Sequence, residues 1–134
     1  MTDEDAHVAI HRDGDVVTAR QKGREIATRI GFTGTELTLI ATAISEIARN
    51  IVEYAWHGEI ILAEARRDGR SGILVIGRDE GPGIADVELA MRDGFSTGRS
   101  LGLGLPGAKR LMDEFHIASE PGVGTTVTMK KWLG

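Results

Sequence analysis

Glycine is unusually dense between Asp79 and Gly107, and this stretch constrains the chain more than any other feature. Seven of the 18 glycines fall within these 29 residues, at positions 81, 83, 94, 98, 102, 104 and 107. Glycine loses more conformational entropy on folding than any other residue, so this density needs a physical reason. A backbone that passes close to a flat or anionic ligand, with its N–H groups pointing inward, supplies that reason. The stretch therefore predicts a nucleotide pocket with a movable cover.

The composition is that of one soluble globular domain over residues 1–134. The chain is long enough to bury a core, with 27% charged and 41% hydrophobic residues. Its net charge of −4 disfavours nucleic-acid binding, and the absence of cysteine excludes disulfides and zinc–thiolate sites. There is no apolar run long enough for a membrane span and no apolar secretion signal. We expect a cytoplasmic protein with neither nucleic acid nor membrane as its partner.

The spacing of apolar residues predicts an ordered set of helices and strands. The strongest prediction is a helix at residues 36–55, capped by Thr35, because its apolar residues recur every three and four positions. The other expected helices are residues 15–30, 86–92 and 105–114, and the expected strands are residues 7–11, 59–66, 73–79, 115–120 and 125–132. A five-residue turn at 68–72 joins the second and third strands. This order predicts an α/β sandwich with a largely antiparallel sheet.

Glu46 and Asn50 lie four residues apart in the predicted long helix, so their side chains leave the same face. Burying a carboxylate and an amide without partners is costly. An amide oxygen can bind Mg²⁺, which usually keeps waters and substrate phosphates as its other ligands. A carboxylate one turn away could accept a proton from an attacking hydroxyl or water. On spacing alone, such a pair is more often a solvated stripe than a functional site, so both interpretations stay open.

Asp79 ends a predicted strand and is followed by Gly81 and Gly83. A carboxylate at a strand end can accept a hydrogen bond from the exocyclic amine of adenine, and the glycines would let the ring approach the backbone. The competing interpretation is an ordinary turn, which this pattern favours when it is considered alone.

The segment from Gly102 to Gly107 matches the G-x-G-x-x-G fingerprint of dinucleotide-binding folds. That fingerprint must follow a strand, whereas the preceding letters FSTGRS are typical of a loop, so we reject a Rossmann fold. A glycine turn into a helix N-terminus still offers free N–H groups to phosphates. Arg99, in the loop itself, is the best candidate to stabilise charge on a transferred phosphoryl group, whereas Lys109 and Arg110 are more typical of a solvated surface.

The motifs are weak singly, but their order along the chain is specific. In sequence they are Glu46-x-x-x-Asn50, Asp79-x-Gly81-x-Gly83, Gly102-Leu-Gly-Leu and Gly122-Val-Gly-Thr125. This order resembles the N, G1 and G2 boxes of the GHKL ATPase superfamily over nearly the whole chain. The stretches AISEIARNIVEYA, DEGPGI and GFSTGRSLGLGLPGAKRLMDEF are similar to the anti-sigma-factor-type serine/threonine kinases, above all to the RsbT-type switch kinases of the stressosome.

The resemblance implies the GHKL (Bergerat) fold, a two-layer α/β sandwich whose mixed, mostly antiparallel sheet carries helices on one face. It also implies a site for ATP and Mg²⁺, with Glu46 as the general base and Asn50 as the metal ligand. Asp79 would bind adenine, and Thr125 would support adenine through Asp79 or a water. The other implied nucleotide contacts are Gly81 and Gly83 beneath the adenine, and Arg99, Gly102, Leu103 and Gly104 around the phosphates under a mobile lid at residues 94–101.

The resemblance further implies a protein serine/threonine kinase that uses ATP to phosphorylate STAS-domain proteins in a stress-signalling, partner-switching module. Kinases of this type also bind and activate a PPM-type phosphatase. The alternative is an anti-sigma factor, or another ATP-gated binding switch, with little transfer activity. Glu46 favours the enzyme, because a pure switch would not need a base, and Glu46→Ala should abolish transfer while sparing ATP binding. An ATP hydrolase of the chaperone or DNA-repair kind is disfavoured because the chain lacks their partner domains.

Overall fold

The computed structural model describes residues 6–55, 57–81 and 104–134. These residues form, in chain order, β1 (Ala6–Ile10), α1 (Asp13–Ile30), α2 (Thr35–Tyr54), β2 (Gly58–Arg67), β3 (Arg70–Asp79), α4 (Gly104–Leu111), β4 (Glu114–Glu120) and β5 (Gly124–Trp132). The expected short helix at 86–92 and the expected lid at 94–101 lie outside the described residues.

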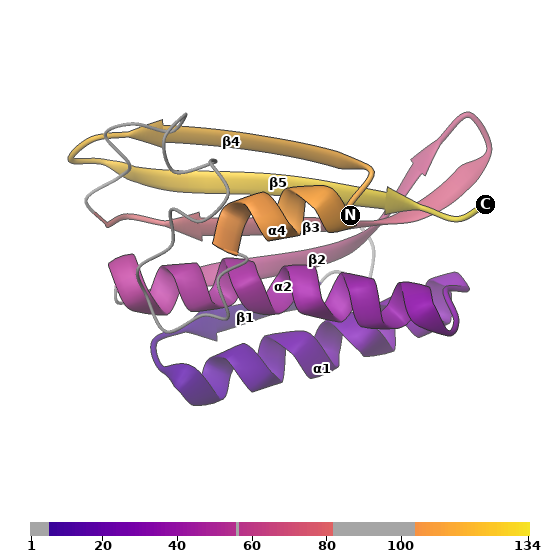
Figure 1. Cartoon of the computed structure of the whole chain (residues 1–134), viewed down its shortest axis with the longest axis horizontal. Helices are drawn as coiled ribbons and strands as arrows, with labels where there is room; N and C mark the ends of the chain where they lie inside the picture. Colours follow the sequence, from indigo (N-terminus) through magenta and orange to yellow (C-terminus); the bar gives the residue numbers. More distant parts are fainter. Residues whose placement is uncertain (1–5, 56, 82–103) are drawn as a thin grey trace.

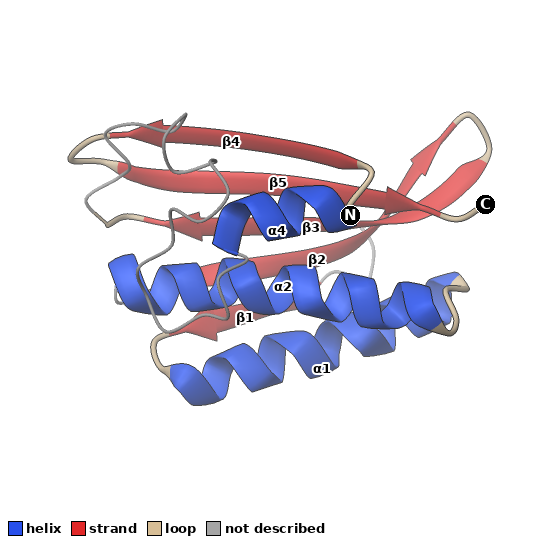
Figure 2. Cartoon of the chain, viewed as in Figure 1, coloured by secondary structure: helices blue, strands red, loops and turns tan. Residues whose placement is uncertain are grey.

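The described strands form a five-stranded sheet in the order β1-β2-β3-β5-β4, and each neighbouring pair is antiparallel. The described helices lie together on one face of this sheet (Figures 1 and 2). The predicted two-layer α/β sandwich is therefore confirmed, as is its largely antiparallel sheet. Within the described part of the chain, no helix is both long enough and apolar enough to cross a membrane.

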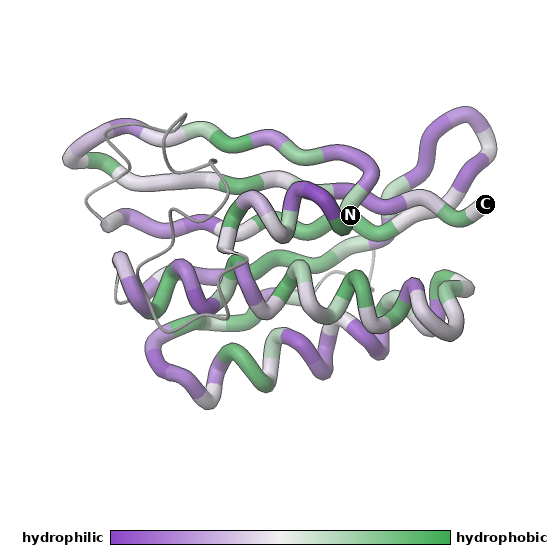
Figure 3. The backbone as a smooth tube through the Cα atoms, in the orientation of Figure 1, coloured by the Kyte–Doolittle hydropathy of each residue, from purple (hydrophilic) through white to green (hydrophobic). Residues whose placement is uncertain are grey.

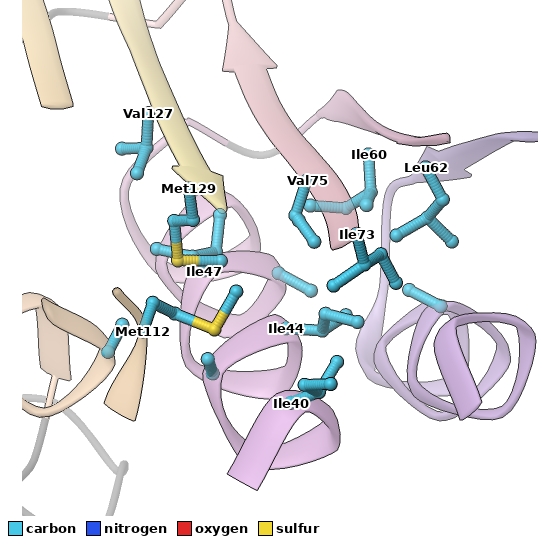
Figure 4. Close-up of a cluster of buried hydrophobic side chains, with 14 of the residues drawn as sticks. Ile40, Ile44, Ile47, Ile60, Leu62, Ile73, Val75, Met112, Val127 and Met129 are labelled. Atoms are coloured by element: carbon cyan, nitrogen blue, oxygen red, sulfur yellow. The ribbon is translucent and has the colours of Figure 1, made fainter. Parts of the chain in front are cut away.

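Helix α2 supplies the largest share of the helical side of the core. Its side chains Ile40, Ile44 and Ile47 are at most 2% exposed, and Figure 4 shows them facing the apolar side chains of β2, β3 and β5. Burying an isoleucine stabilises a fold by about 1.5–3 kcal/mol relative to leaving it exposed. In Figure 3, the hydrophobic residues accordingly gather along α2 and the middle strands, whereas the β2–β3 hairpin end is hydrophilic. These contacts fix α2, and every side chain it carries, against the central strands.

The turn between β2 and β3 is shorter than the sequence predicted. It consists of Asp68 and Gly69, whose φ angles are 52° and 79°, and the strands pair up to Arg67 and Arg70. Two successive residues with positive φ match the twist of a tight hairpin, and Asp-Gly is a favoured pair for this turn. The prediction of a five-residue turn at 68–72 is therefore wrong, because the paired strands continue until only a two-residue turn joins them.

Helix α1 begins at Asp13, two residues before its predicted start, and α2 and α4 also differ from the prediction at their ends. Gly34, rather than Thr35, occupies the N-cap position of α2, and its φ of 58° is one that a β-branched threonine adopts only with strain. Helix α4 ends at Leu111 instead of residue 114, because the Asp113 N–H already bonds the Lys130 carbonyl at 2.9 Å on the neighbouring strand.

Candidate active site

The Glu46 carboxylate lies in the interior, where α2 packs against α4. Glu46 is 5% exposed, so the solvated-stripe interpretation does not apply to it. Its Oε1 accepts a hydrogen bond of 3.1 Å from the backbone N–H of Gly104, the first residue of α4. Its Oε2 lies 3.4 Å from Nη1 of Arg49, one turn along α2. The candidate base is thus joined directly to the end of the glycine-rich stretch.

Burial raises the pKa of Glu46 above its ordinary value. The positive charge of Arg49 and the Gly104 N–H act in the opposite direction, and the negative charge of Glu53 adds to the effect of burial. A carboxylate whose pKa is raised toward neutrality accepts protons more readily than an ordinary surface carboxylate. The electrostatics of this position therefore suit a general base.

Asn50 follows Glu46 by one turn of α2 and is half-buried. Its side-chain amide makes no hydrogen bond to another described residue. The described residues also contain no group of three or more His, Cys, Asp or Glu side chains placed to hold a metal ion. An amide oxygen can bind Mg²⁺ when water and substrate phosphates supply the other ligands, so Asn50 stays a candidate metal ligand.

Asp79 ends the central strand β3, where the register places it between Gly58 of β2 and Thr125 of β5. Its Oδ1 accepts the Gly81 N–H at 2.9 Å, and among the described residues no donor reaches its Oδ2. Gly81 packs so tightly that an added Cβ would lie 2.6 Å from the Cβ of Ala55. The carboxylate is therefore oriented by a turn, and its Oδ2 has no donor among the described residues, so the turn and the adenine interpretations are compatible.

Thr125 is held beside Asp79 by the start of β5. Thr125 is 6% exposed, and its Oγ1 shares a hydrogen bond of 2.8 Å with Oγ of Ser119 on β4. The preceding residue, Gly124, has a φ of 150°, and an added Cβ would overlap the backbone carbonyl of Asp79. Only glycine allows the strand to approach Asp79 this closely. The fold thus places Thr125 opposite Asp79, a position compatible with support of adenine through Asp79.

Predicted site residues meet at two places in the described structure. Glu46 lies against Gly104, and Asp79 lies with Gly81 beside Thr125. The two places offer different groups that suit a nucleotide: a helix start, where backbone N–H groups can donate, and a carboxylate at a strand end, which can accept. Four predicted contacts lie outside the described residues: Gly83, Arg99, Gly102 and Leu103.

Two polar residues of the site were not predicted from the sequence. Arg49 follows Glu46 by three positions, a spacing at which opposite charges on a helix pair, so this signal was present in the sequence. Ser119 faces Thr125 through the β4–β5 register, and only the pairing of the strands reveals that contact.

Comparison with known families and curated proteins relates the chain to ATPase domains. The model of the histidine kinase-like ATPase domain matches residues 11–131. Serine/threonine-protein kinase RsbT of Bacillus subtilis is 48% identical over 126 residues, covering 94% of this chain and 95% of RsbT. An anti-sigma F factor of Caldanaerobacter subterraneus is 36% identical over 122 residues, covering 87% of this chain and 84% of that factor.

Solved structures show the same fold. A structure of the RsbU and RsbW domains of Rv1364c from Mycobacterium tuberculosis matches 97% of this chain with a TM-score of 0.65 at 24% identity. The match spans 33% of that longer chain. The mycobacterial sensor histidine kinase MprB matches 95% of this chain and 97% of its own, with a TM-score of 0.56 at 17% identity.

Proposed function

The chain belongs to the family of histidine kinase-like ATPase domains, and from this premise we propose that it is an ATP-dependent protein serine/threonine kinase. The similarity to RsbT, itself named a serine/threonine-protein kinase, extends over nearly the full length of both chains. The observation that carries the proposal is the buried Glu46 carboxylate, which is hydrogen-bonded to the first N–H of α4. A switch that only bound partners would not need a carboxylate at this position.

In this proposal, Glu46 takes the proton from a serine or threonine hydroxyl of the partner protein. The hydroxyl oxygen forms a bond to the γ-phosphorus, the bond from that phosphorus to ADP breaks, and the proton remains on Glu46. When bound, Mg-ATP supplies the phosphoryl group and the metal offsets its negative charge. The chain contributes orientation and proton acceptance.

The remaining site residues hold the nucleotide. Asn50 is the Mg²⁺ ligand, and Asp79 accepts the exocyclic amine of adenine with Thr125 in support. Gly81 and Gly83 admit the adenine close to the backbone. Around the phosphates lie Gly102, Leu103 and Gly104, together with Arg99.

We further propose STAS-domain proteins of a partner-switching module as substrates and a PPM-type phosphatase as a downstream target. The support is the similarity to RsbT together with the resemblance of the motifs to the stressosome switch kinases. A second candidate is an anti-sigma factor with little transfer activity, which the similarity to the anti-sigma F factor favours. The kinase requires proton acceptance by Glu46, whereas the anti-sigma factor does not.

The sharpest test of the kinase is Glu46→Gln. The glutamine amide oxygen can still accept the Gly104 N–H, whereas Glu46→Ala would leave that N–H without its partner and disturb α4 as well. Removing a general base lowers rates by about 10²–10⁴-fold. We expect transfer from Mg-ATP to a STAS-domain protein to fall by that order, while calorimetry shows ATP affinity changed by no more than a few-fold.

Glu25→Gln is the matched control, because Glu25 is a 65% exposed glutamate of α1 whose salt bridge within the described structure is with Lys22. This variant should transfer phosphate at the wild-type rate. Full transfer by Glu46→Gln would disprove the assignment of the base. Tight ATP binding without any transfer by the wild type would instead favour the anti-sigma or switch function.

A further inference from the structure

We propose that Arg49 is a positioning residue for phosphoryl transfer, whose guanidinium fixes the Glu46 carboxylate in the charged form and the orientation that proton acceptance requires. This inference rests on the proposed function, because it assigns a partner to the base of that reaction. Arg49 itself need not touch the nucleotide or the partner protein. It acts through Glu46.

The geometry secures both oxygens of the Glu46 carboxylate. Oε1 accepts the Gly104 N–H at 3.1 Å, and Oε2 lies 3.4 Å from Nη1 of Arg49. The two partners come from different helices, α4 and α2, and so define the plane of the carboxylate. The Arg49 side chain is 32% exposed, whereas that of Glu46 is 5% exposed. The arginine thus extends from solvent to a buried anion.

In the part of the chain that the structure describes, Arg49 is the cation that acts on the charge of Glu46. Among the described residues, the groups that act on the Glu46 charge are Arg49 and Glu53 on α2 and the Gly104 N–H on α4. Glu53 has the same sign as Glu46 and disfavours its ionised form. A buried carboxylate without a cation takes up a proton rather than stay charged. Without Arg49, Glu46 would hold a proton over more of the pH range and could not accept another.

Arginine suits this role better than lysine. A guanidinium stays charged at every physiological pH and is weakly hydrated, so it can approach a buried anion at small desolvation cost. A lysine would keep the sign of the charge but hold the carboxylate less firmly. The two variants Arg49→Gln and Arg49→Lys therefore separate loss of charge from loss of geometry.

The direct test measures the pKa of Glu46 in the full chain without any partner protein. Carboxyl ¹³C resonances of ¹³C-glutamate-labelled protein are followed against pH, and Glu46→Gln identifies the Glu46 signal by its absence. Removing an opposite charge at this distance shifts a carboxyl pKa by about one unit or more. We expect an upward shift of that size in Arg49→Gln and a smaller one in Arg49→Lys. No shift is expected in the control Arg24→Gln, which removes an exposed arginine of α1.

The second readout is the pH profile of transfer to a STAS-domain protein. The acid limb should move to higher pH by about one unit in Arg49→Gln, lowering the rate about tenfold at the acid end. Arg49→Lys should restore most of that loss, and ATP affinity should be unchanged in both. An unshifted Glu46 resonance in folded Arg49→Gln would overturn the inference, as would a loss of ATP affinity with an unshifted profile. If the wild type shows no transfer, the proposed kinase fails, while the resonance still decides the role of Arg49.

Discussion

At the level of single residues, the Glu46 carboxylate is 5% exposed and must be ionised to accept a proton. Burial opposes that ionisation and raises its pKa, while Arg49 and the Gly104 N–H oppose the effect of burial only in part. The folded protein therefore holds a charge that it would be more stable without. Such a conflict is typical of catalytic groups, because reactivity and stability make different demands on one site.

This conflict predicts that Glu46→Gln is more stable than the wild type near neutral pH. The folded pKa of Glu46 lies above its unfolded value of about 4.5. The stability that the protonated Glu46 side chain contributes is therefore complete below that value, and it is lost as pH rises through the folded pKa. Thermal unfolding is measured between pH 4 and pH 8. The melting temperature of Glu46→Gln should exceed that of the wild type most at pH 8, and the difference should shrink toward pH 4. A wild type that is the more stable protein at pH 8 would contradict this account.

Much of the candidate site could be predicted from the sequence, because the order of the motifs carried the information. Glu46 and Gly104 are 58 residues apart, yet each belongs to a recognisable motif, and the fold brings them into contact. The resemblance implied that Thr125 supports adenine through Asp79 or a water, and the β3–β5 register places Thr125 opposite Asp79. The hydrogen bond of Ser119 to Thr125 could not be predicted. It depends on the β4–β5 register, which no local pattern specifies.

At the level of elements, the contact between α2 and β3 determines where the site residues lie. Gly77 of β3 faces Ile47 of α2 so closely that an added Cβ would overlap the Ile47 side chain. Ile47 directly follows Glu46 and is β-branched, so its side chain has little rotamer freedom in a helix. The missing side chain at position 77 therefore sets the distance between α2 and the sheet.

Gly77→Ala should destabilise the fold by about 1–3 kcal/mol, because overpacking a rigid contact forces backbone shifts. Urea unfolding followed by circular dichroism measures this change. Gly14→Ala is the matched control, since nothing lies within 4 Å of an added Cβ at this position in the first turn of α1. Alanine is a better helix former than glycine, so the control should be neutral or stabilised by up to about 1 kcal/mol. Equal effects of the two substitutions would contradict the packing argument.

The same elements show where sequence patterns reach their limit. Helix α2 was predictable because its apolar spacing and its burial agree along its length. Its cap was not, because Thr35 has the chemistry of a cap whereas Gly34 has the conformation that the chain requires. The end of α4 depends on the hydrogen bond from the Asp113 N–H to the Lys130 carbonyl. The pattern of residues 105–114 alone does not predict this bond.

At the level of the whole molecule, the end of the sheet away from Asp79 is closed by contacts around Trp132. Glu114 accepts the indole N–H of Trp132 at 2.7 Å and two hydrogen bonds from Arg67, at 2.8 and 3.3 Å. The Arg67 guanidinium also lies 4.9 Å from the centroid of the Trp132 ring. These contacts join β2, β4 and β5, so the C-terminal strand is held at the end opposite the candidate site.

Glu114→Gln should weaken this closure in a pH-dependent way. The hydrogen bonds from Trp132 and Arg67 lower the pKa of Glu114 below 4.5. The stability it contributes is therefore present above about 4.5 and is lost as pH falls through the folded pKa. Chemical unfolding should find Glu114→Gln less stable than the wild type at pH 7 and equal to it near pH 2. ATP affinity at pH 7 should not change, and a loss of affinity would show that this end of the sheet is coupled to the site.

The central claim is that this chain transfers phosphate to a hydroxyl with Glu46 as the base. The measurement that tests it most directly is incubation of the wild type and Glu46→Gln with radiolabelled Mg-ATP and a STAS-domain protein of the source organism. Acid stability and mass spectrometry then identify the phosphorylated residue. We predict an acid-stable phosphoserine or phosphothreonine on the partner, formed by the wild type and lost with Glu46→Gln. An acid-labile phosphohistidine, or ATP binding with no label on the partner, would contradict the claim.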